Sequence, residues 1–137
     1  MLASILVFLS AMVIAALGLI HLVYTFRGPK LVPRNVEVRA AMESDSPGIS
    51  SETTMWNAWV GFNASHSLGA ILFGLVYGYL ALAHPDMLFT SVFLSAVGIA
   101  MLVGLLYLGK RYWFSIPFRG ISASLFFFVV GQIVARV

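Results

Sequence analysis

The chain has 137 residues, of which 61% are hydrophobic and only 9% are charged. A soluble domain carries about 25% charged residues, so this composition excludes an ordinary water-soluble protein. The absence of cysteine excludes disulfides, iron–sulfur clusters, covalently attached haem and cysteine nucleophiles. Length and composition therefore predict one all-α transmembrane domain over residues 1–137, built as a membrane-embedded four-helix up-down bundle.

Residues 2–26 form the first predicted membrane helix, because no charged side chain interrupts them. At a rise of about 1.5 Å per residue, this run is long enough to cross a hydrocarbon core of about 30 Å. No basic residue precedes the apolar run. We therefore expect a retained span and not a cleaved signal peptide.

The next segment, residues 27–53, is the one substantial polar loop, with four of the five acidic and four of the eight basic residues. A short surface helix is expected over 35–42. The loop is longer than an ordinary connector, so we expect it to cover a pocket, to dock on a partner or to remain mobile. If the loop is docked, Arg34 and Arg39 are candidates for binding lipid phosphate or an anionic substrate.

Three further helices are predicted over residues 54–84, 87–109 and 120–136. The first of these has aromatic side chains toward both ends, as expected for the two headgroup levels. The last is short, with 16 uncharged residues between Arg119 and Arg136. We expect those two arginines to extend to the interfaces and make up the missing length.

The basic residues predict the orientation, because seven of the eight fall on the face that carries the loop. They are Arg27, Lys30, Arg34, Arg39, Lys110, Arg111 and Arg119. The positive-inside rule places this face in the cytoplasm and both termini on the outer side, in a bacterial cytoplasmic membrane. Basic residues beside membrane spans are topology signals, so no nucleic-acid partner is expected.

The helix over 54–84 carries the polar side chains of most interest, with Trp56, Trp59, Asn63 and His66 on one stripe and Ser67 beside it. His66 lies about 16 Å from the start of this helix, near mid-membrane. Ionisable groups at that depth are costly and usually face the bundle interior. Either His66 carries a function, or it is a neutral imidazole bonded to Asn63, Ser67 or a facing helix.

His21, on the first helix, is expected at a depth of about 9 Å from the same face. The two histidines could line one cavity. The expected depth difference of about 7 Å speaks against their ligating one haem from opposite sides. No metal site is predicted, since the chain has no His-Glu-x-x-His pair.

Two ladders of small residues predict close approach by other helices, Gly61-Ser65-Gly69 and Ala70-Gly74-Gly78. Gln132, in the fourth predicted helix, is expected to hydrogen-bond across helices.

Two resemblances centre on the same helix. Ser65–Phe73 is loosely similar to the Ser-x-x-His-Arg-x-x-Gly stretch of cytochrome b-type anchors of succinate dehydrogenase, although the serine spacing differs and no arginine follows His66. Met55-Trp56, Gly61-Phe62-Asn63 and Ser65-His66-Ser67 resemble small four-helix bacterial integral membrane proteins of uncharacterised function. The second resemblance covers about half the chain; it implies a fold and supplies no activity.

Three functions remain open. The first is an accessory or structural subunit of a larger membrane complex, with lipids, other subunits or further copies of the chain as partners. The second is a binder of a hydrophobic ligand such as a quinone, haem, carotenoid or lipid. Its candidate residues are His21, Trp56, Trp59, Asn63, His66 and Ser67. The third is a membrane-embedded enzyme on a lipid-like substrate, with His66 or His21 as acid–base.

Overall fold

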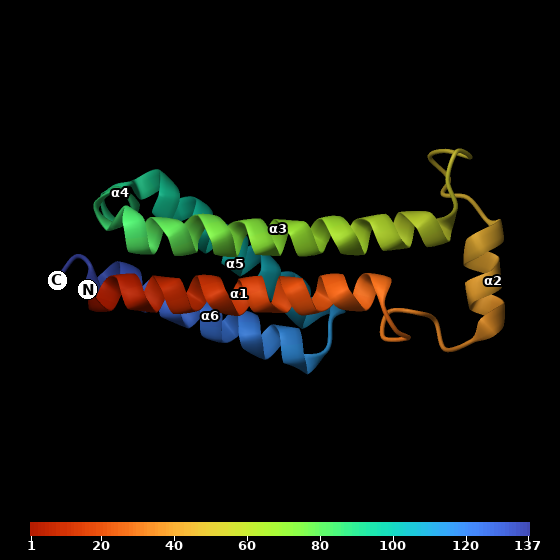
Figure 1. The fold of residues 1–137 in the computed structure, drawn as a ribbon, viewed down its shortest axis with the longest axis horizontal. Coiled ribbons are helices and arrows are strands. Elements are labelled where there is room, and N and C mark those ends of the chain that lie inside the picture. Colours follow the sequence, from red (N-terminus) through yellow and green to blue (C-terminus); the bar gives the residue numbers. More distant parts are fainter. The chain divides into compact units, whose positions relative to one another are not determined.

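The structure is a computed structural model that describes all residues 1–137. It contains six helices and no β-strand. The helices are α1 (Leu2–Phe26), α2 (Val36–Ser44), α3 (Met55–Ala83), α4 (Pro85–Thr90), α5 (Val92–Tyr112) and α6 (Ser115–Val134) (Figure 1). Four of them, α1, α3, α5 and α6, are long and apolar enough to cross a membrane. The all-α class and the number of long apolar helices are therefore confirmed.

The third long helix begins later than the sequence predicted. A short separate helix, α4, starts at Pro85, where a proline is favoured because its missing N–H would have no partner anyway. α5 then starts at Val92, and the hydroxyl of Ser91 caps it by accepting a hydrogen bond of 3.2 Å from the Leu94 N–H. The predicted span over 87–109 is thus two helices separated by a capping serine.

The fourth long helix also differs from its predicted bounds, because α6 begins at Ser115 and not at residue 120. Pro117 is its third residue, within the first turn, where no backbone N–H has a partner inside the helix. With 20 residues α6 is about 30 Å long. This length matches a hydrocarbon core of about 30 Å. Because Arg119 is the fifth residue of α6, the extension of its side chain to the interface stays a prediction.

The chain divides into two compact units, and the division runs through α1 and α3. The first unit comprises Met1–Leu17 and Ala70–Val137, and the second comprises Gly18–Gly69. The apolar core lies in the first unit. Its buried side chains are Val7, Ala11, Ile14, Ala70, Phe73, Tyr77, Ala81, Leu88, Leu102, Leu105, Ile121 and Phe128.

Glycines bring the helices of the first unit close together. A Cβ added at Gly74 on α3 would lie 2.5 Å from the Ala15 Cβ and 2.7 Å from the Ala11 carbonyl oxygen, both on α1. Gly98 on α5 faces the ring of Phe128 on α6. The predicted packing role of the ladder around Gly74 is therefore confirmed.

Two buried polar pairs join helices of the same unit. The hydroxyl groups of Ser10 on α1 and Ser124 on α6 are 2.8 Å apart. The Ser95 hydroxyl on α5 donates to the Gln132 Oε1 on α6 over 2.9 Å. Buried polar groups need such partners, and the expectation that Gln132 bonds across helices is confirmed.

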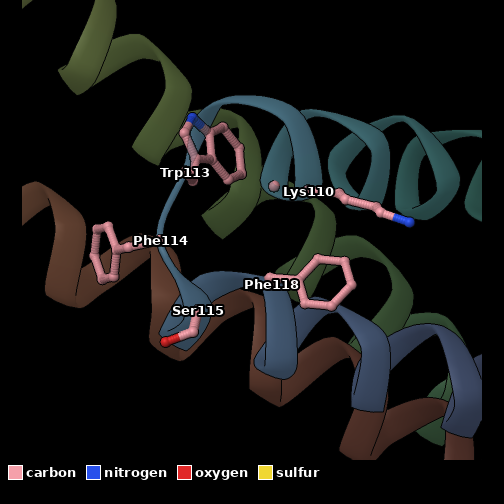
Figure 2. Close-up of a pocket in the computed structure, with 6 residues that line it drawn as sticks. Lys110, Trp113, Phe114, Ser115 and Phe118 are labelled. Atoms are coloured by element: carbon pink, nitrogen blue, oxygen red, sulfur yellow. The ribbon is translucent and has the colours of Figure 1, made fainter.

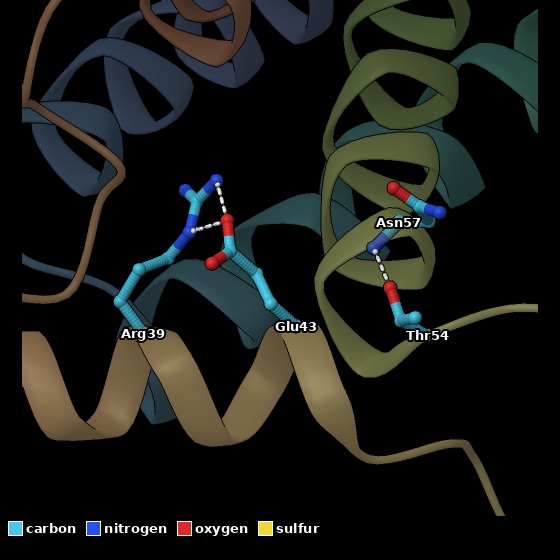
Figure 3. A network of polar contacts seen from close by, with 4 residues as sticks. All are labelled: Arg39, Glu43, Thr54 and Asn57. Carbon is cyan, nitrogen blue, oxygen red and sulfur yellow. Dashed lines mark hydrogen bonds and ion pairs between the residues drawn. The ribbon is translucent and has the colours of Figure 1, made fainter.

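The second unit contains the end of α1, the loop with α2, and the start of α3, and in it α2 runs across the direction of the two long helices (Figure 1). Asn35 caps α2 by accepting a hydrogen bond of 2.8 Å from the Glu37 N–H. Thr54 caps α3 by accepting one of 3.2 Å from the Asn57 N–H (Figure 3). The expected surface helix in the loop is present.

Candidate ligand-binding site

The second unit brings together His21 from α1 with Asn63 and His66 from α3. The His21 Nε2 lies 2.9 Å from the Asn63 Oδ1. The rings of His21 and His66 meet edge to face, with centroids 5.6 Å apart and an interplanar angle of 85°. All three side chains are part-buried. We call them the histidine–asparagine cluster.

The expected depth difference of about 7 Å between the two histidines is wrong, because their ring centroids are closer than that. The expectation placed the end of α1 and the start of α3 at one level. In the second unit, the start of α3 instead extends past the end of α1, toward α2 (Figure 1). This offset brings a residue eleven positions into α3 beside one only five positions before the end of α1.

Asn63 is held by its own helix. Its Nδ2 donates a hydrogen bond of 2.8 Å to the Trp59 carbonyl oxygen. Ser67, which is fully buried, donates one of 2.8 Å to the Asn63 carbonyl oxygen. The Ser67 hydroxyl is thus used inside α3, whereas the amide of Asn63 faces His21.

The two tryptophans of the predicted stripe contact the loop. The Trp59 Nε1 donates a hydrogen bond of 3.0 Å to the Leu31 carbonyl oxygen. The guanidinium of Arg39 lies 3.1 Å from the centroid of the Trp56 ring, which is a cation–π contact. The loop is therefore docked on the start of α3. Sequence reasoning missed Leu31, because a backbone carbonyl leaves no signal in residue type.

The two candidate anion-binding arginines differ in their surroundings. Arg39 forms the one ion pair of the structure, with a hydrogen bond of 2.7 Å from its Nε to the Glu43 Oε1 on the same helix (Figure 3). Its charge is thus satisfied within the loop. Arg34 is exposed and makes no ion pair. The anion-binding role of both arginines stays a prediction.

Replacing Trp59 by phenylalanine is expected to loosen the loop, because the ring would stay while the donor to the Leu31 carbonyl is lost. One net hydrogen bond contributes about 0.5–1.5 kcal/mol. Backbone amides of residues 27–35 should therefore exchange with solvent deuterium roughly two- to tenfold faster, as measured by mass spectrometry of peptic fragments.

Tyr79→Phe is the matched control, because it removes a hydroxyl hydrogen-bonded to the His84 Nε2 outside this unit. It should leave loop exchange unchanged. Equal exchange of residues 27–35 in Trp59→Phe and the unaltered protein would show that the Trp59–Leu31 bond does not hold the loop.

Two hollows in the surface show where a ligand would find room. One, of about 210 Å³, is lined by Gly109, Lys110, Trp113, Phe114, Ser115 and Phe118 at the turn between α5 and α6. The Lys110 ammonium and the Ser115 hydroxyl both point away from it (Figure 2). The other, of about 240 Å³, is lined by Leu19, Ile20, Val23 and Tyr24. All four of these residues belong to α1, and none of them is a member of the histidine–asparagine cluster.

The class that these observations define is an all-α protein with four helices long and apolar enough to cross a membrane. No group of three or more histidine or acidic side chains is placed to hold a metal ion. Comparison with protein-family models, curated proteins and solved structures finds no match to this chain. Its function is therefore argued from its own residues.

Proposed function

We propose that the chain is an integral protein of a bacterial cytoplasmic membrane, in which the four long helices form an up-down bundle. Loop 27–53 lies in the cytoplasm and both termini lie outside. The support is the presence of four helices long and apolar enough to cross a membrane, with seven of the eight basic residues on the face that carries the loop when the helices alternate in direction. Compartment-sensitive reporters fused to each terminus test the orientation, and a cytoplasmic signal from either one would contradict it.

Within that bundle, the histidine–asparagine cluster binds the polar head of a hydrophobic small molecule, as a quinone- or lipid-type ligand would offer. The observation that carries this function is the convergence of His21, Asn63 and His66 from two apolar helices, with each side chain still part-exposed. Hydrocarbon offers no hydrogen bonds, so polar groups there need a partner of their own. The same stretch of α1 has exposed apolar side chains at Leu19, Ile20 and Val23, against which an apolar tail could lie.

Haem fits the cluster less well than such a ligand. Axial ligation by two histidines would need one nitrogen of each ring directed at the iron from opposite sides. The His21 Nε2 is instead hydrogen-bonded to Asn63, and the edge of one ring meets the face of the other.

Gentle purification followed by mass spectrometry of extracted small molecules tests the binding function. We expect a molecule enriched over bulk lipid in the unaltered protein and depleted at least tenfold in His66→Ala. The matched control is His84→Ala, because His84 is exposed and lies outside the cluster. Equal extracts from the unaltered protein and His66→Ala would contradict the function.

A second candidate is an accessory subunit, and the ladder Gly61-Ser65-Gly69 favours it. A Cβ at Gly61 or Gly69 would meet nothing within 4 Å, so this part of α3 is open to another helix. Partner chains that copurify in mild detergent, and are lost in Gly61→Leu, would support this role. The enzyme hypothesis uses the same two histidines, and no separate observation favours it.

A further inference from the structure

The hydrogen bonds around Asn63 fix which way its amide points. The Trp59 carbonyl oxygen can only accept a hydrogen bond, so the atom of Asn63 that lies 2.8 Å from it must be the Nδ2. The Oδ1 is then the atom that faces His21. Trp59 is itself held by its bond to the Leu31 carbonyl, which steadies the turn of α3 that carries the accepting oxygen.

This orientation places the proton on one nitrogen of His21. An amide oxygen carries no hydrogen, so the bond of 2.9 Å between it and the His21 Nε2 requires an N–H at Nε2. A neutral imidazole has a single N–H. The Nδ1 of His21 is therefore a hydrogen-bond acceptor, and no protein donor binds it in the structure.

We propose, on the basis of the binding function above, that the ligand of the histidine–asparagine cluster has a hydroxyl group that donates a hydrogen bond to the His21 Nδ1. Hydroxyl-bearing amphiphiles of two kinds share this chemistry, a hydroquinone with an isoprenoid tail and an isoprenoid alcohol. A quinone, ether or ester head has only acceptor oxygens and cannot make this bond. A site with an unpaired acceptor discriminates against ligands that lack the matching donor.

Defined probes test this inference on the full chain in lipid nanodiscs. The first pair is a short-tailed prenyl hydroquinone and its dimethyl ether, kept anaerobic, and the second pair is a prenyl alcohol and its methyl ether. Each pair differs only in the donor hydrogens and the added methyl groups. We expect the hydroxyl member of at least one pair to bind about tenfold more tightly than its ether, as measured by equilibrium dialysis. The pair with the larger ratio of ether to hydroxyl dissociation constants shows whether the ligand is a hydroquinone or an alcohol.

The methyl group of the ether also adds bulk, which could weaken binding by itself. The oxidised quinone is therefore compared with the hydroquinone and its dimethyl ether. It has no methyl on its oxygens and no hydrogen to donate, and it should bind as weakly as the ether. In Asn63→Leu the proton on His21 is no longer fixed, and the hydroxyl preference should fall toward one. Far-UV circular dichroism shows whether that variant keeps its helices.

The outcomes separate the two proposals. If no probe binds the unaltered protein better than His66→Ala, the binding function itself fails. If probes bind through the cluster but ether or quinone binds as tightly as the hydroxyl form, the inference fails while the binding function stands. An unchanged hydroxyl preference in folded Asn63→Leu would overturn the assignment of the proton by Asn63.

Discussion

Phe128→Ala is expected to lower the free energy of unfolding by about 2–3 kcal/mol, the largest effect of any single substitution considered for this chain. Phe128 is fully buried, and its ring meets those of Phe73 and Tyr77 with centroids 6.3 and 5.3 Å away. In soluble cores the same change costs about 3–5 kcal/mol. In a membrane the unfolded side chain is solvated by lipid, so the cavity and lost contacts account for most of the effect.

Phe126→Ala is the matched control, because Phe126 lies on the same helix and is 63% exposed. Titration with sodium dodecyl sulfate, followed by circular dichroism, gives the unfolding midpoint of both variants. Phe126→Ala should unfold close to the unaltered protein and Phe128→Ala at clearly lower detergent. Similar midpoints for the two variants would mean that Phe128 is not part of a packed core.

Gly74→Ala should have the second largest effect, a loss of about 1–3 kcal/mol from overpacking. The added methyl would lie 2.7 Å from the Ala11 carbonyl oxygen and 2.5 Å from the Ala15 Cβ. Neither neighbour is the flexible end of a long side chain, so α1 and α3 have to move apart. Separated helices lose contacts along their whole interface.

Gly104→Ala provides the comparison, since Gly104 is inside α5 and a Cβ there would meet nothing within 4 Å. An alanine in a helix interior is favoured over glycine by roughly 0.5–1 kcal/mol, so this variant should be neutral or slightly more stable. We therefore expect Gly74→Ala to lower the unfolding midpoint, and Gly104→Ala to raise it slightly or leave it unchanged. A Gly74→Ala variant as stable as Gly104→Ala would refute the close contact of α1 and α3.

The long helices were predictable from the sequence because uncharged runs of membrane length have few alternatives. The positions of the helix ends were less predictable. The prediction ended one helix before Lys110, but charged side chains at a helix end reach solvent along their aliphatic stems, and α5 continues to Tyr112. The prediction started the last helix after Arg119 because of Pro117. A proline is tolerated in the first turn of a helix, however, and α6 begins at Ser115.

The members of the candidate site were predictable from residue type and helical spacing, but their arrangement was not. Periodicity placed Asn63 and His66 on one stripe of α3, and the low charge of the segment marked them as unusual. The position of His21 beside His66 depends on the offset between α1 and α3, which helical spacing within either segment does not give. Spacing also could not show that Trp59 and Trp56 hold that loop, because their partners lie far away in sequence or belong to the backbone.

The charged residues of the docked loop are unevenly distributed along it. Its first part carries Arg27, Lys30 and Arg34 without an acid, a formal charge of +3. Its second part, residues 37–52, has four acids and one arginine, a formal charge of −3, and that arginine is neutralised by Glu43. With the loop in the cytoplasm as proposed, an anionic leaflet attracts the first part by about 1 kcal/mol per basic residue and repels the second. In that orientation, the anionic lipid content of the leaflet would act in opposite directions on the two parts of the segment whose Leu31 carbonyl accepts from Trp59. Salt at about 0.1 M would screen this effect at distances beyond about 10 Å.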